Sequence, residues 1–279
     1  MQNRVRCLRL ALAVLVLAGI PAAAQGPAYK APRTPDGKPN LNGIWQVINT
    51  ANWDIQGHAA RPALMTVAGP LGPIPAPSVV AFGAVGSVPG GLGVVEGDEI
   101  PYQPSAAAKK KSNAEHWLTS DPEIKCYLPG VPRATYMPFP FQIVQTPKVI
   151  LITYEFAGAT RTINMEKPTE AQTESWMGWS NGHWEGDTLV VDVTGQNDQT
   201  WFDRAGNFHS EALHVVERYT PRSADTMLYE ATIEDPKVFT HPWKMSMPIY
   251  RRVEKNAQLV EFNCVEFVEE LLYGQFRKK

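Results

Sequence analysis

Hydrophobic and polar residues alternate along most of the chain from residue 141 onwards, and this pattern predicts a succession of short β-strands. Turn-forming pairs such as Thr146-Pro147 and Asp235-Pro236 separate the runs, and a similar run lies earlier, around Trp45. The predicted strands cover residues 43–49, 142–145, 148–155, 159–165, 188–194, 212–219, 227–234, 244–251 and 259–262. Such spacing with short connections is typical of an antiparallel meander that forms a barrel or a sandwich. We expect a mainly β protein with a single antiparallel barrel.

The rest of the chain lacks this alternation. Residues 25–42 are polar and rich in Pro and Gly, which indicates an extended arm. Residues 54–125 contain long stretches with little charge and frequent Gly and Pro, and they predict a long irregular insertion, either mobile or a lid. Good helix formers predict a short helix over 105–118, and an amphipathic pattern predicts another over 265–274. We therefore predict one barrel domain over 43–279, with the insertion inside it.

The amino terminus has the pattern of a secretory signal peptide. Three arginines precede the apolar run 10–20, which is too short to span a bilayer. Small residues follow, and cleavage between Ala24 and Gln25 fits the usual site. We predict a signal peptide over 1–24 and a periplasmic or secreted mature protein; an uncleaved anchor is the alternative. Since no later run is long and apolar enough to cross a membrane, we predict no stable membrane insertion.

Charge and cysteine content narrow the function classes. The formal net charge is −2, and removal of the arginine-containing signal peptide makes the mature chain more acidic. Nucleic-acid binding needs a basic face, so we exclude it. Cys126 and Cys264 are the two cysteines outside the predicted signal peptide. An isolated pair in an exported protein predicts a disulfide bond, and two separate buried thiols are the alternative.

A polar loop dense in titratable and aromatic side chains joins two predicted strands in the region 195–213. Asp203 and His209 lie six residues apart in it. A carboxylate that orients an imidazole is the core of general acid–base catalysis, so the pair is a candidate catalytic site, with Arg204 or Arg133 to stabilise an anion. The alternative is structural: Asp203 caps the turn and His209 bonds to the backbone.

A metal site is a third interpretation of this loop, with His209, Glu211 and His214 as ligands. On a strand, His209 and Glu211 would share a face while His214 points to the opposite one, which argues against this site. No metal-binding motif, phosphate-binding loop or nucleophile elbow occurs elsewhere in the sequence. We predict no metal and no cofactor.

Tryptophan and methionine recur together, in Trp176-Met177-Gly178-Trp179 and again after Trp243. Such groups suit flat apolar ligands, and the alternative is that they fill the barrel core. The candidate ligand-binding residues are Trp201, Glu211, His214, Trp179 and Trp243.

Glu217 and Arg218 lie within an otherwise apolar strand, and one of them should point inward if that strand is half buried. An inward charge needs a partner, and Arg161, Arg251 or Arg252 could pair with Glu217.

Two resemblances add to this picture. Gly43-x-Trp45, followed by the β meander and by Arg251-Arg252, resembles calycin (lipocalin-like) barrels. That resemblance implies that Trp45 closes the base of the barrel and packs against one of the two arginines. The phrases GHWEGDTLVVDVTG and DRAGNFHSEALHVVER resemble a large group of exported bacterial proteins. That second resemblance implies export and a shared fold, and it assigns no catalytic residue.

Three functions fit the sequence. The first is binding of a small apolar or aromatic molecule inside the barrel, with the loop between Trp201 and His209 at its mouth. The second is an acid–base enzyme, a hydrolase, hydratase or isomerase, that uses the Asp203–His209 pair in the same pocket. The third is a structural or envelope-assembly role, which would need no enclosed pocket.

Overall fold

The computed structural model describes residues 29–79, 87–268 and 271. The predicted signal peptide over 1–24 lies outside the described residues, as does half of the predicted helix over 265–274. No helix in the described part of the chain is long and apolar enough to cross a membrane.

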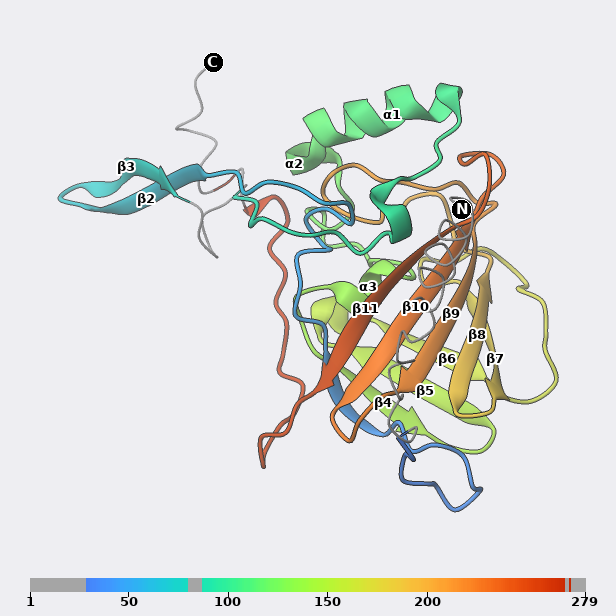
Figure 1. Cartoon of the computed structure of the whole chain (residues 1–279). Coiled ribbons are helices and arrows are strands. Elements are labelled where there is room, and N and C mark those ends of the chain that lie inside the picture. Colours follow the sequence, from blue (N-terminus) through green and yellow to red (C-terminus); the bar gives the residue numbers. More distant parts are fainter. Residues whose placement is uncertain (1–28, 80–86, 269–270, 272–279) are drawn as a thin grey trace, which may run out of the picture. The chain divides into compact units, whose positions relative to one another are not determined.

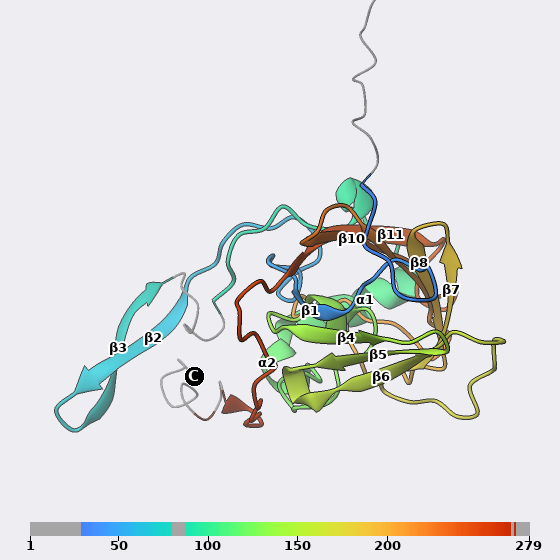
Figure 2. The ribbon, with the colours of Figure 1, turned by 90° about the horizontal axis from the view of Figure 1, so that it is seen from below.

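Within the described residues, nine strands form a closed barrel, and the prediction of a mainly β barrel fold is confirmed (Figure 1). The strands follow the order β1-β11-β10-β9-β8-β7-β6-β5-β4, and β1 closes the ring by pairing with both β11 and β4. Figure 2 shows β4, β5 and β6 across the barrel from β10 and β11. The strands are β1 (Gly43–Gln46), β4 (Phe141–Gln145), β5 (Val149–Tyr154), β6 (Thr160–Asn164), β7 (Trp179–Glu185), β8 (Thr188–Thr194), β9 (His214–Pro221), β10 (Thr226–Glu234) and β11 (Trp243–Arg251).

Alternation along each strand separates core from surface. In β10, Met227, Tyr229, Ala231 and Ile233 are buried, and the residues between them are partly exposed. Because side chains of a strand point alternately to opposite faces, this period of two places one set inside the barrel.

One pair of neighbours departs from the antiparallel pattern. β6 and β7 run parallel, and their register covers only Ile163 with Ser180 and Asn164 with Asn181. All other neighbouring strands of the barrel are antiparallel. Since a parallel connection must cross over, residues 165–178 form a long loop between β6 and β7.

Among the segments predicted to build the barrel, two differ from the structure. The sequence analysis missed β7 as a strand of its own, because Asn181, Gly182 and the turn at Gly186 weaken the strand pattern. β7 forms because it pairs with β8 along its whole length. The predicted strand over 259–262 is wrong: this segment is irregular, and the ring of Phe262 packs 4.8 Å from those of Phe139 and Phe156.

The insertion between β1 and β4 contains its own short elements. A two-stranded sheet forms from β2 (Ala63–Gly69) and β3 (Gly72–Val79), in a region without a predicted strand. The predicted helix over 105–118 corresponds to α1 (Pro104–Glu115) and the first residues of α2 (Trp117–Ser120). The remaining elements are the 3₁₀ turns η1 (Glu96–Asp98) and η2 (Phe156–Gly158) and the helix α3 (Arg133–Tyr136), whose four residues are all buried.

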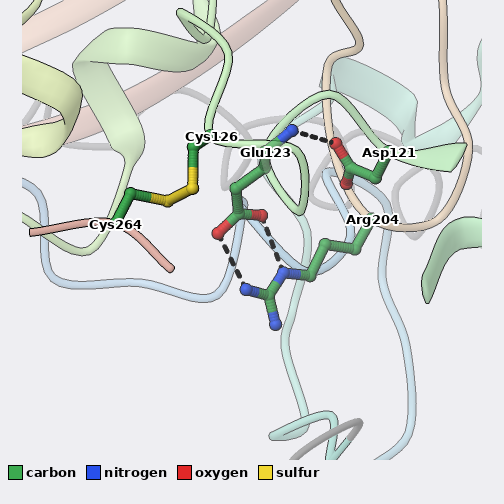
Figure 3. The surroundings of a disulfide bond; sticks show 5 residues. All are labelled: Asp121, Glu123, Cys126, Arg204 and Cys264. Atoms are coloured by element: carbon green, nitrogen blue, oxygen red, sulfur yellow. Dashed lines mark hydrogen bonds and ion pairs between the residues drawn. A yellow bond between two sulfur atoms is a disulfide. The ribbon is translucent and has the colours of Figure 1, made fainter. Parts of the chain in front are cut away.

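Two predicted long-range contacts are present. The Arg251 guanidinium stacks 4.1 Å from the centre of the Trp45 ring, as expected for the base of the barrel. Cys126 and Cys264 form a disulfide bond, which confirms that prediction. The bond joins the segment after β11 to the segment before α3, beside the ion pair of Glu123 and Arg204 (Figure 3).

Candidate functional site

Asp203 holds its loop to the chain that follows β1. Its carboxylate accepts hydrogen bonds from the Ile55 backbone N–H at 3.0 Å and from the Asn207 backbone N–H at 3.1 Å. The Asn207 side-chain amide donates a third at 2.6 Å. Burial, with the nearby charge of Asp54, raises the pKa of Asp203 to about 7. The Asp203 side chain thus caps its own turn at Asn207 and ties it to the backbone of Ile55.

His209 is buried and has other partners. Its Nδ1 lies 2.8 Å from the Ser210 carbonyl oxygen, and its Nε2 lies 2.6 Å from the Thr200 hydroxyl. Because a carbonyl oxygen can only accept, Nδ1 donates and the Thr200 hydroxyl donates to Nε2. Burial lowers the pKa of His209. The imidazole is therefore neutral and fixed in one tautomer.

The structure gives Asp203 and His209 separate sets of hydrogen bonds, and both side chains are at most 1% exposed. Neither side chain lines the cavity between β6 and β7, the cavity beside the disulfide bond or the cavity beside Asp235. The loop is also covered, since Asn113 of α1 donates a hydrogen bond to the Gly206 carbonyl oxygen. This geometry matches the structural interpretation of the pair.

Arg133 and Arg204, the predicted anion-stabilising residues, belong to one buried ion network. Arg133 forms two parallel hydrogen bonds to Asp121, at 2.7 and 2.9 Å, and a third to Glu123 at 2.8 Å. Its Nε donates to the Asn52 side chain. Arg204 bonds to both oxygens of Glu123 (Figure 3). Burial alone would raise the pKa of Glu123, but Arg204 and Arg133 together lower it to about 2. The positive charges of Arg133 and Arg204 are thus balanced by the carboxylates of Asp121 and Glu123.

Most of the predicted ligand-binding residues lie apart from one another. Trp201 and Trp243 are buried in the hydrophobic core. Glu211 forms an exposed ion pair with Lys237. His214 lies on the outer face between Asp192 and Glu234, at 3.3 and 3.4 Å. Trp179 is the member of this set that lines a cavity described below.

A cavity of about 680 Å³ lies where β6 and β7 meet, and we call it the β6–β7 cavity. Two others, of about 270 and 240 Å³, lie beside the disulfide bond and beside Asp235. The β6–β7 cavity is lined by Leu128, Val149, Thr160, Arg161, Thr162, Asn164, Thr169, Ser175, Trp176, Met177, Gly178, Trp179 and Ser180.

The outer wall of the β6–β7 cavity comes from the loop 165–178 and the start of β7. Trp176 is half-buried against the Tyr127 ring, with ring centres 5.0 Å apart. Trp179 is 39% exposed, and its indole N–H donates to the Thr169 hydroxyl at 3.1 Å. The Asn181 side chain pins the same loop by bonding to the backbone of Thr169. Aromatic rings are therefore held in fixed positions at an open cavity.

The inner wall reaches a polar cluster inside the barrel. Arg161 of β6 donates to Glu217 of β9 at 2.5 Å, which confirms one of the predicted partners of Glu217. The hydroxyl groups of Tyr219 and Tyr229 donate to the other oxygen of Glu217 at 3.0 and 2.8 Å. Arg161 also lines the β6–β7 cavity, so the cluster and the cavity meet at this residue.

Sequence reasoning found one part of this cavity and missed another. The Trp176–Trp179 group was noted for its tryptophan and methionine content, and three of those side chains line the cavity. Arg161 was considered only as a partner of Glu217, and Ser180 was not considered. Their place at the cavity follows from the parallel pairing of β6 and β7, which no local pattern reveals.

Among the described residues, no group of three or more His, Cys, Asp or Glu side chains is arranged to hold a metal ion. Comparison with known proteins found no matching family model, curated protein or solved structure.

Proposed function

We propose that this protein is an exported binding protein for a small molecule with an apolar or aromatic body, held in the β6–β7 cavity. The observation that carries this proposal is a cavity of about 680 Å³ with two tryptophans and a methionine in its wall. Small-molecule sites are typically concave, about 300–1,000 Å³ in volume, and lined by apolar and aromatic side chains with a few polar groups.

The chemistry of the wall favours a flat or elongated apolar ligand. Trp176 and Trp179 offer ring faces, and Met177 adds a polarisable side chain that adapts to shape. Leu128 and Val149 add further apolar side chains to the lining. The indole N–H of Trp179 is already engaged with the loop, so its ring is available mainly for apolar contact.

Export is supported by the covalent link between Cys126 and Cys264, since disulfide bonds persist in oxidising compartments such as the periplasm or the cell exterior. The predicted signal peptide points to the same location.

Binding is favoured over acid–base catalysis by the surroundings of His209. A general base must reach the proton it removes. The Nε2 atom of His209 is occupied by the Thr200 hydroxyl, and both residues are buried. We therefore expect His209→Gln to leave ligand affinity at the β6–β7 cavity within about twofold.

The neutral fluorescent probe N-phenyl-1-naphthylamine tests the proposed site. We expect saturable fluorescence enhancement with the purified protein, and a loss of affinity of about tenfold or more in Trp176→Ala and in Trp179→Ala, because each variant removes an aromatic wall. The matched control is Trp184→Ala. Trp184 lies in β7, as Trp179 does, but it packs on the core and does not line the cavity. Probe binding that is unchanged in both wall variants would contradict the proposal.

A further inference from the structure

The β6–β7 cavity is electrically asymmetric. Arg161 is charged, whereas the other residues in its lining are neutral. Asn164, Thr160 and Thr162 add polar side chains from the same strand. No carboxylate belongs to the described lining of this cavity, so its only formal charge is positive.

The hydrogen-bonding capacity of Arg161 is only partly used. Its Nη2 donates to Glu217, while Nε and Nη1 are buried and have no hydrogen-bond partner among the described residues. The Ser180 hydroxyl, also in the cavity lining, is buried without a partner in the same part of the chain. Native proteins rarely leave buried polar groups unpaired, because such groups lose their hydrogen bonds to water and gain none in return.

Glu217 does not supply the missing acceptors. One of its oxygens accepts from Arg161, and the other accepts from Tyr219 and Tyr229. Glu217 lies outside the described cavity lining, whereas Arg161 belongs to it. Of the two ion-pair members, Arg161 is therefore the one that lies at the cavity, and Glu217 lies behind it.

We propose that the ligand of this cavity is an amphipathic oxyanion, an aromatic or aliphatic body with a carboxylate or sulfonate, whose charged oxygens are held by Arg161 and Ser180. This inference rests on the proposed binding function and names the ligand class for the same site. The tryptophans hold the apolar body, and the guanidinium N–H groups and the serine hydroxyl donate to the oxygens. Hydrogen bonds between a guanidinium and an oxyanion are among the strongest that proteins form.

Access to these donors depends on the short parallel ladder. The unpaired polar atoms are covered in the structure, and the two strands pair at only two positions. The residues of β6 before Ile163 and those before Ser180 have no partner in that ladder. Binding at these donors therefore requires the two strands to separate slightly there, a movement that breaks no antiparallel pairing.

The test compares two probes that share a skeleton. 1-Anilinonaphthalene-8-sulfonate carries an oxyanion, and N-phenyl-1-naphthylamine is its neutral counterpart. We expect the wild-type protein to bind the sulfonate about tenfold more tightly than the amine, at a site that Trp179→Ala weakens for both. Equal affinities, or tighter binding of the amine, would overturn the oxyanion inference and leave the proposed function in place.

Two variants test the donors. Ser180→Ala removes one hydroxyl and should lower sulfonate affinity about threefold to tenfold with amine affinity within about twofold. Arg161→Met combined with Glu217→Gln removes both charges of the pair together, which avoids a lone buried charge. This double variant should lower sulfonate affinity by more than about tenfold. If it does not fold, Ser180→Ala and the probe comparison still decide the question.

The outcomes separate the two proposals. If neither probe binds, or if both bind without dependence on the wall tryptophans, the proposed function fails and the oxyanion inference fails with it. If both probes bind at the tryptophans but the donor variants weaken them equally, only the oxyanion inference fails.

Discussion

At the residue scale, Asp203 is the clearest source of pH dependence. Its pKa is raised to about 7 by burial and by Asp54, against an ordinary value of 3.8. The folded protein therefore holds a proton that the unfolded chain has lost between about pH 4 and 7. Stability from this group is fully present below the unfolded pKa and is lost as pH rises through the folded pKa.

We expect Asp203→Asn to remove this pH dependence of the free energy of unfolding. The wild-type free energy of unfolding should fall relative to the variant by up to about 1.4 kcal/mol per pH unit between pH 4 and 7. Urea unfolding at several pH values measures this difference. Asp198→Asn, in the same loop but exposed, is the control and should run parallel to the wild type. Curves for Asp203→Asn that also run parallel would show that Asp203 ionises with an ordinary pKa.

The residue scale also shows what a sequence can predict about a site. The structural interpretation of Asp203 was available from its position before a turn, because Asp commonly caps turns. Either Glu217 or Arg218 was predicted to point inward and to need a partner, since a buried charge cannot stay unpaired. The structure buries Glu217. Which arginine fills that role depends on where β6 and β9 lie in the barrel, and that is a property of the fold.

At the element scale, the loop 165–178 must return to β7 through a tight backbone turn. Gly178 has φ +66°, and a Cβ there would lie 2.7 Å from Gln196 Cγ and 2.8 Å from the Thr194 carbonyl oxygen. Gly186, at the other end of β7, has φ +59° but open space around the same position. The two glycines thus form a matched pair that is similar in φ and different in packing.

We expect Gly186→Ala to cost about 1 kcal/mol, the usual penalty of a left-handed conformation for a residue with Cβ. Gly178→Ala should cost about 1–3 kcal/mol more, because its Cβ also overlaps packed backbone and side chain. It should also weaken N-phenyl-1-naphthylamine binding by several fold, since Gly178 lines the cavity. Chemical unfolding and probe titration of both variants check this. Equal stability of the two would show that the loop moves freely against β8.

Elements with strict alternation were predictable, and those defined by their neighbours were not. β10 alternates along its whole length, so its sequence alone predicts a strand and shows which of its side chains are buried. β7 carries Gly182 and polar residues, and it is a strand because β8 pairs with it. Phe262 lies in an apolar run that predicts a strand, yet its ring packs on Phe139 and Phe156 in an irregular segment. The β6–β7 cavity was likewise not predictable, because it depends on one parallel pair of strands.

At the scale of the whole molecule, the disulfide bond spans most of the barrel. Cys126 precedes β4 and Cys264 follows β11, with a sequence separation of 138. Near the bond, the Val260 backbone N–H donates to Glu155, and Phe262 packs on Phe139. The covalent link therefore fixes the segment after the last strand to the segment that carries the buried ion network.

We expect the Cys126→Ser, Cys264→Ser double variant to lose up to about 5 kcal/mol of unfolding free energy, because the chain-entropy model assigns that value to a loop of this length. Urea unfolding of the oxidised wild type, the reduced wild type and the double variant measures the loss. The reduced wild type should have the same free energy of unfolding as the double variant, and reductant should not change that of the double variant. The barrel is closed by backbone pairing alone, so probe binding at the β6–β7 cavity should survive in the folded double variant. Equal stability of oxidised and reduced protein would show that the unfolded chain gains no freedom when the bond opens.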